Sequence, residues 1–299
     1  MNQRTGWLLG LLSVLIFSTN TPIARSVIGD GSMEPVTLVM LRFVLAAILF
    51  GITMATTSLG MARGDEKPLD RRIIWICLIS GGINGVTLAS FYSALQFLEA
   101  SLTSVLGIAM FPSMTLLFLA LGGEMLTRKK LMRLSVALLG LYFLLGVSGQ
   151  LNARGVLFVF IAASTYAIHL ASVQWYMKPY NTWATTSLMI SGSAVVVLIM
   201  WLWNGADLAV PGWRGWLIVV YQVVLLTYIG RTVTYAAIAR IGSGQMALLT
   251  PIETVLTIIW AMLFLGEKLS ANQLIGAGLI LASAAMAAEF RREKRAIIS

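Results

Sequence analysis

Charged residues are scarce in this sequence, because Asp, Glu, Lys and Arg together make up 11% of its 299 residues. Hydrophobic residues make up 58%, which leaves too little polar surface to solvate a water-soluble domain of this size. No segment shows the alternating polarity of barrel strands, so we expect an all-α membrane protein. The basic residues form short clusters between apolar runs, and the net charge of +9 therefore does not indicate a nucleic-acid partner.

Residues that carry enzyme chemistry are equally scarce. The sequence has one Cys and one His, which excludes an intramolecular disulfide and argues against a zinc site or a Cys–His pair. Every Asp is in a predicted loop, which removes an intramembrane aspartyl pair, and neither a nucleophile motif nor a phosphate-binding loop is present. We therefore expect neither an enzyme nor a bound metal or cofactor.

Apolar runs are, by contrast, abundant. Ten of them are long enough to cross a hydrocarbon core of about 30 Å, which takes roughly 20 helical residues. They cover residues 7–27, 36–55, 73–97, 101–121, 131–147, 155–176, 183–203, 213–239, 244–265 and 271–288. The loops between them are short, which favours a self-contained, monomeric permease in a lipid bilayer over a receptor or scaffold.

Basic residues accumulate on alternate loops. Fifteen of the 21 Lys and Arg residues fall on one side of the predicted spans and three on the other, while Arg25, Arg42 and Arg231 fall inside spans. Because basic loop residues resist translocation, we expect the richer side to be cytoplasmic. Both termini lie on that side, so the sequence predicts a multi-pass protein of a bacterial-type inner membrane with cytoplasmic ends.

The two halves of the sequence resemble each other. A shift of the chain on itself pairs Tyr92 with Tyr235 and aligns the turn 123–127 (GEMLT) with 266–270 (GEKLS). Each half, residues 1–150 and 151–299, contains five predicted spans, and an odd number inverts the second half relative to the first. The first turn runs on into three basic residues and the second does not, as expected on opposite membrane faces.

At these residues the chain resembles the drug/metabolite transporter (DMT) superfamily, and within it the EamA-type ten-helix branch. The resemblance also rests on the segments 17–20 (FSTN), 41–43 (LRF) and 91–95 (FYSAL). The chain looks most like the YddG-type aromatic amino-acid exporters, which implies a central cavity lined by spans 1 to 4 and 6 to 9. The resemblance implies export of small organic metabolites, above all amino acids including aromatic ones, by alternating access. Multidrug or organic-cation efflux is the alternative.

Two charged residues deep inside predicted spans are the first candidates for a solute site. Glu253 is expected near the middle of the ninth span, where an unpaired carboxylate costs roughly 2.5 kcal/mol or more. It either contacts a substrate amine or accepts a proton, or it forms a structural ion pair. Arg231 in the eighth span suits a solute carboxylate. Its alternative is an ion pair with Glu253.

Three tyrosines share the eighth span with Arg231. Tyr221, Tyr228 and Tyr235 are spaced at helical intervals, which predicts one face that carries both the rings and the guanidinium. Such a face offers stacking and cation–π contacts to an amine or an aromatic solute. In the alternative interpretation the rings pack between helices.

Further polar and aromatic residues complete the candidate set, which also contains Tyr92, Gln245 and Trp260. Asn20 precedes Pro22, whose missing N–H frees a backbone carbonyl and predicts a bend in the first span. Gln245 and Trp260 flank Glu253, and for Trp260 packing is the favoured interpretation.

Asn84, His169 and two arginines have structural alternatives. Asn84 lies in the segment 81–85 (GGING), where it either contacts substrate or bridges closely packed helices. His169 either relays protons or is a buried imidazole with satisfied hydrogen bonds. Arg25 and Arg42 are expected to extend to the outer interface, where they could attract anionic solutes.

Overall fold

The structure, a computed structural model, describes residues 3–58, 66–121, 132, 135–136, 139–140, 143, 152–176, 179–205, 207–209, 212–241, 249–272 and 274–282. The named elements are α1 (Gln3–Ser18), α2 (Asn20–Ile28), α3 (Pro35–Thr56), α4 (Arg71–Ala94), α5 (Ala100–Leu121), α7 (Ala153–Tyr176), α8 (Thr182–Trp203), α9 (Gly212–Tyr221), η2 (Gln222–Gly230), α10 (Arg231–Ile241) and α12 (Thr250–Leu265). Residues 271–272 and 274–282 are helical as well. The predicted all-helical fold is confirmed.

Five of the described helical stretches are long and apolar enough to cross a membrane. They are Arg4–Ile28, Pro35–Thr56, Arg71–Ala94, Thr182–Trp203 and Gly212–Thr234, and three shorter apolar stretches are Ala100–Phe111, Ala153–His169 and Ile252–Leu265. The predicted fifth span lies largely outside the described residues, and the tenth is described only to residue 282. Large apolar side chains such as Leu8, Ile52 and Ile199 are exposed, as on helices that face lipid.

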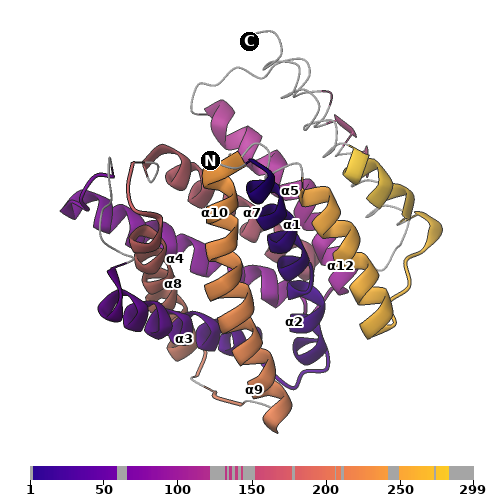
Figure 1. The fold of residues 1–299 in the computed structure, drawn as a ribbon. Helices are drawn as coiled ribbons and strands as arrows, with labels where there is room; N and C mark the ends of the chain where they lie inside the picture. Colours follow the sequence, from indigo (N-terminus) through magenta and orange to yellow (C-terminus); the bar gives the residue numbers. More distant parts are fainter. Residues whose placement is uncertain are drawn as a thin grey trace.

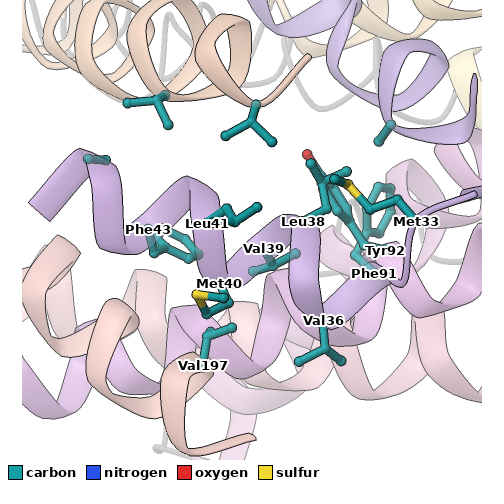
Figure 2. Close-up of a cluster of buried hydrophobic side chains, with 14 of the residues drawn as sticks. Met33, Val36, Leu38, Val39, Met40, Leu41, Phe43, Phe91, Tyr92 and Val197 are labelled. Atoms are coloured by element: carbon teal, nitrogen blue, oxygen red, sulfur yellow. The ribbon is translucent and has the colours of Figure 1, made fainter. Parts of the chain in front are cut away.

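The helices pack as one bundle. Helix α1 lies between α10 and α12, and α4 crosses both α7 and α8 (Figure 1). Helix α3 packs against α8 and η2, and α5 packs against α7 and α12. A buried apolar cluster joins α3 to its neighbours, and Figure 2 shows Leu38 and Phe43 of α3 with Tyr92 of α4 and Val197 of α8.

Helices α4 and α8 cross with their backbones in contact. A Cβ atom at Gly81 would lie 2.0 Å from the carbonyl oxygen of Met189, and one at Gly192 would lie 2.1 Å from that of Leu78. The Ser193 hydroxyl donates to the Gly81 carbonyl at 2.6 Å. Small residues permit this approach, so the predicted packing role of the 81–85 segment is confirmed. We call this contact of α4 with α7 and α8 the glycine seam. It is formed by Ser80, Gly81, His169, Ser172, Gly192 and Ser193.

The connecting segments gather at two ends of the bundle. At one end the Lys67 amide donates to the Pro179 carbonyl at 2.9 Å, and the Asn181 side chain donates to Glu66 at 2.9 Å. At the other end the Thr37 hydroxyl donates to the Asp207 carbonyl at 2.9 Å. Helices α4 and α8 therefore both begin at the Lys67 end, whereas α3 and α9 begin at the opposite end, so the two pairs run in opposite directions.

The turn after α12 holds the start of α5. Gly266 ends α12 with a φ of 67°, a left-handed conformation that glycine adopts without strain. The Glu267 carboxylate then accepts the backbone N–H groups of Ala100 at 2.7 Å and Ser101 at 2.9 Å. Burial, and then the nearby Glu267 carboxylate, raise the pKa of Glu99, while Arg25 lowers it. These hydrogen bonds join the turn after α12 to the start of α5, which lie far apart in the chain.

Candidate functional site

The first predicted span is broken next to the candidate site. Helix α1 ends at Ser18 and α2 begins at Asn20. Pro22 has no N–H to donate to the Ser18 carbonyl, and the Thr257 hydroxyl of α12 donates to this carbonyl at 2.9 Å instead. The predicted bend is confirmed, and α12 occupies the backbone acceptor that proline leaves free.

The eighth predicted span is irregular as well. It consists of α9, the π-helix η2 and α10. Within η2 the Thr227 hydroxyl donates at 2.9 Å to the carbonyl of Gln222, five residues earlier. Short π-helical segments occur frequently at functional sites. The expectation of uninterrupted α-helical spacing along this span is therefore wrong across residues 222–230.

Arg42 of α3 is the centre of a buried polar group. Its side chain is 2% exposed. Nη1 donates to Asn20 Oδ1 at 3.0 Å and to the Tyr92 hydroxyl at 2.7 Å, while Nε donates to the Thr227 hydroxyl at 2.8 Å. The Tyr92 hydroxyl lies within donating distance of two acceptors, Asn20 Oδ1 at 2.6 Å and Gln222 Oε1 at 3.2 Å, and its one proton serves one of them at a time. We call these five residues the Arg42 cluster.

The placement of Arg42 corrects the expectation from the sequence. We expected its side chain to extend toward the outer interface, but its guanidinium donates to three side chains inside the bundle. Those partners come from α2, α4 and η2, so hydrogen bonding within the protein replaces contact with water. Arg25 donates to the Leu95 carbonyl at the end of α4.

A second guanidinium lies close to the Arg42 cluster. Arg231, the first residue of α10, interacts electrostatically with both Arg42 and His169. Its Nε atom is buried and has no hydrogen-bond partner within the described part of the chain. Among the described side chains Arg231 forms no ion pair with Glu253, so the structural ion pair considered as an alternative is not realised in this conformation.

Glu253 lies at the start of a helix rather than in its middle. Helix α12 begins at Thr250, which places Glu253 in its first turn. The unpaired backbone N–H groups of a first turn favour a carboxylate there. Trp260, further along α12, donates to the Ser18 hydroxyl at 3.1 Å and stacks on Phe264 with a centroid separation of 5.6 Å. These contacts support the packing interpretation of Trp260.

Tyr228 belongs to an aromatic group. Its ring centroid lies 4.9 Å from that of Phe50 and 6.1 Å from that of Trp183, and its hydroxyl lies 2.7 Å from that of Thr53. These partners lie on α3 and α8, at the half of the bundle nearer the Lys67 end. Figure 2 shows the neighbouring part of the buried core around α3.

The other tyrosines of this span are placed differently. The Tyr221 hydroxyl lies 2.6 Å from that of Thr19, at the break between α1 and α2. Tyr221 and Tyr228 therefore contact different helices instead of forming the single stripe that α-helical spacing predicted. The side chain of Tyr235 and the whole of Gln245 lie outside the described residues.

Asn84 and His169 lie outside the Arg42 cluster, between α4 and its neighbours. His169 Nδ1 lies 2.8 Å from the Ser80 hydroxyl and 3.0 Å from the Ser80 carbonyl. Asn84 donates to the Ser193 hydroxyl at 3.5 Å, and its Oδ1 atom has no partner in the described part of the molecule. These contacts support the interpretation of His169 as a structural imidazole whose hydrogen bonds are satisfied within the protein.

Gln222 and Thr227 were missed by the sequence analysis, and Arg42 was placed too near the surface. A π-helix leaves no simple periodic signal, so the side chains that it turns inward could not be identified. The signal for Arg42 was present, because it is the one charged residue in an otherwise apolar stretch of the second span.

A model of the EamA-like transporter family matches residues 4–146 and 153–288 of this chain. An uncharacterized transporter of Archaeoglobus fulgidus is 26% identical over 288 residues, which cover 95% of this chain and 97% of that protein. An uncharacterized transporter of Clostridium kluyveri is 19% identical over 289 residues, with coverage of 93% and 91%.

A solved structure, described only as the crystal structure of a protein, resembles the fold along nearly its whole length. It covers 98% of this chain and 99% of its own, with 20% sequence identity and a TM-score of 0.63. At this identity the likeness concerns the fold alone. The two stretches that match the family model indicate a duplicated architecture.

Proposed function

The chain belongs to the EamA-like transporter family, and we propose that this membrane transporter moves small organic metabolites by alternating access. In this proposal the two parts that move against each other are oppositely inserted five-helix halves, residues 1–150 and 151–299. Proteins of this family are transporters and not enzymes, so the partners of the chain are a membrane and a small-molecule substrate. The asymmetry of the basic loops supports an inner-membrane location with both termini in the cytoplasm.

The Arg42 cluster is the observation that carries this proposal. Charged side chains inside a membrane protein are costly and usually mark solute or ion paths. Here the buried guanidinium is held where two irregular helices meet, the break between α1 and α2 and the π-helix η2. Transporters place discontinuous helices of this kind at the substrate site, since irregular backbone is tolerated where it lines a cavity.

Amino acids, including aromatic ones, are the substrates we propose, and export is the proposed direction. Guanidinium groups bind carboxylates, and the group of Phe50, Trp183 and Tyr228 offers ring surface to an aromatic side chain. The proposed contact residues are Asn20, Tyr92, Tyr228, Arg231, Tyr235, Gln245 and Glu253, with Trp260 packed beside them and with Asn84 and His169 in the wall formed by α4, α7 and α8.

Organic-cation efflux is the second candidate, and Glu253 favours it. Its side chain is partly buried and forms no ion pair among the described residues, and a free carboxylate attracts a cation. If cations are the substrates, Glu253→Gln will abolish their transport while Arg231→Ala will not. If amino acids are the substrates, Arg231→Ala will reduce their flux sharply in protein that remains folded.

A flux assay with purified protein in liposomes tests the proposed function. The panel contains amino acids, organic cations and phosphorylated metabolites, each with and without a proton gradient. We expect flux of amino acids, with aromatic ones among the best substrates. Flux of cations alone would establish the second candidate, and flux of none of the three groups would contradict the proposed substrate range.

A further inference from the structure

We propose that Arg42, Gln222 and Arg231 form an oxyanion subsite, which receives the carboxylate of the transported solute. The proposal rests on the proposed transport function, in which a guanidinium binds the solute carboxylate. It adds two residues, Arg42 and Gln222, that the pattern of the sequence did not place in a site.

Charge balance is the first argument. Arg42 and Arg231 are both cations inside the bundle, and they repel each other electrostatically. Neither forms an ion pair with a carboxylate within the described residues, and the groups that hold Arg42 are the neutral side chains of Asn20, Tyr92 and Thr227. An anion between the two guanidinium groups would relieve this repulsion, whereas a cation would increase it.

Unused hydrogen-bond donors are the second argument. Arg231 Nε is buried and has no partner in the described structure, and the same holds for Nε2 of Gln222, whose side chain is 0% exposed. Arg231 Nε can only donate, and Nε2 of Gln222 donates when Oε1 accepts from the Tyr92 hydroxyl, so in both cases the missing partner is an acceptor. Leaving a buried donor unpaired costs about 1 to 3 kcal/mol, and a carboxylate oxygen would remove this cost.

The position of the subsite links binding to movement of the helices. Arg42 on α3 joins Asn20 of α2 and Tyr92 of α4 to Thr227 of η2. An oxyanion on the guanidinium competes with these neutral acceptors, because hydrogen bonds between ions are stronger than those with neutral groups. Binding would therefore loosen contacts of η2 with α3, which lie in different halves of the chain, as alternating access requires.

The experiment compares phenylalanine with phenethylamine, which lacks the carboxylate. Each compound is measured as a competitor in the liposome assay and as a stabiliser of the melting temperature of the detergent-solubilised protein. We expect the parent protein to prefer phenylalanine. Arg42→Ala and Gln222→Leu should each weaken phenylalanine binding, by about 100-fold for Arg42→Ala, and should leave phenethylamine binding within about threefold. The matched control Arg214→Ala removes an exposed arginine and should keep the parent preference.

The possible outcomes distinguish a failure of the proposed subsite from a failure of the proposed function. If the parent protein transports amino acids but folded Gln222→Leu and Arg42→Ala keep the full preference for phenylalanine, the subsite is wrong and the proposed function stands. If Arg42→Ala does not fold, Gln222→Leu decides alone. Inorganic phosphate is the third probe, and competition by phosphate that exceeds that of phenylalanine would assign the subsite to phosphorylated solutes. If none of the probes is transported or stabilises the protein, both proposals are overturned.

Discussion

The glycine seam and the Arg42 cluster show two ways of burying polar groups between helices. In the glycine seam the backbones of α4 and α8 touch, and hydroxyl and imidazole groups contact one another or backbone carbonyls. The Arg42 cluster lies at the break between α1 and α2 and at the π-helix η2, and its charged group has only neutral acceptors. The glycine seam has the features of a fixed contact, whereas the Arg42 cluster retains an unused donor, Nε2 of Gln222, and its side chains can exchange hydrogen-bond partners.

The largest expected effect comes from a methyl group in the glycine seam. Gly81→Ala places a Cβ atom 2.0 Å from the Met189 carbonyl oxygen, so α4 and α8 must separate. Overpacking of this kind costs about 3 kcal/mol or more, and we expect little monodisperse protein in size-exclusion chromatography. Gly51→Ala is the matched control, because a Cβ atom there has no neighbour within 4 Å. Normal yield of Gly81→Ala would show that the seam is not rigid.

A smaller change in the Arg42 cluster should reduce transport in protein that still folds. Thr227→Val removes the hydroxyl that accepts a hydrogen bond from Arg42 Nε and donates one to the Gln222 carbonyl. Because a hydrogen bond to a charged group contributes about 1.5 to 3 kcal/mol, we expect substrate flux per folded protein to fall about tenfold or more. The melting temperature should fall as well, because the deleted hydrogen bond also stabilises the folded protein, but enough folded protein should remain for the flux to be measured. Unchanged flux would mean that the Arg42 cluster only stabilises the packing of its helices and has no part in transport.

The corresponding change in the glycine seam should leave transport intact. Ser193→Ala deletes the donor to the Gly81 carbonyl and leaves the glycine contact intact. Hydrogen bonds between membrane helices contribute about 0.6 kcal/mol on average, so the melting temperature should fall slightly and the flux should remain. If Ser193→Ala reduced flux as strongly as Thr227→Val, the contrast between the two regions would be lost.

The smallest effect is expected outside both regions, at the turn before α5. Burial and the nearby Glu267 carboxylate raise the pKa of Glu99, so charged Glu99 disfavours folding above that pKa, and the penalty disappears as the pH falls through it. Glu99→Gln should therefore raise the melting temperature at neutral and alkaline pH, by an amount worth less than about 0.5 kcal/mol. The difference should vanish in acid. A stabilisation that does not depend on pH would refute the role of the charge.

The fold was largely predictable from the sequence because apolar runs and small residues act locally. The helical class, the bend before Pro22 and the close packing at Gly81 all follow from the chemistry of single residues, and the structure confirms them. The ten-span count and the inversion of the halves remain predictions. The start of α12 at Thr250 was not predicted, because the apolar run continues upstream of this residue.

The site was predictable only in part, because its side chains are brought together by irregular helices. Asn20 and Tyr92 were identified from the sequence and do lie together. Their partner Gln222 was not found, because α-helical spacing was applied to a segment that is π-helical. The interior position of Arg42 depends on acceptors from three other elements, and their convergence cannot be read from the sequence of α3.

The most direct test of the central claim is the reactivity of a cysteine placed next to the Arg42 cluster. The sequence contains a single cysteine, Cys77, so the measurement uses Thr19→Cys, one residue before Asn20, in a Cys77→Ala background, with a membrane-impermeant thiol reagent on sealed vesicles. We predict that the thiol reacts from at least one side of the membrane and that a transported amino acid slows the reaction. A thiol that remains unreactive from both sides during active transport would contradict a solute path through this cluster.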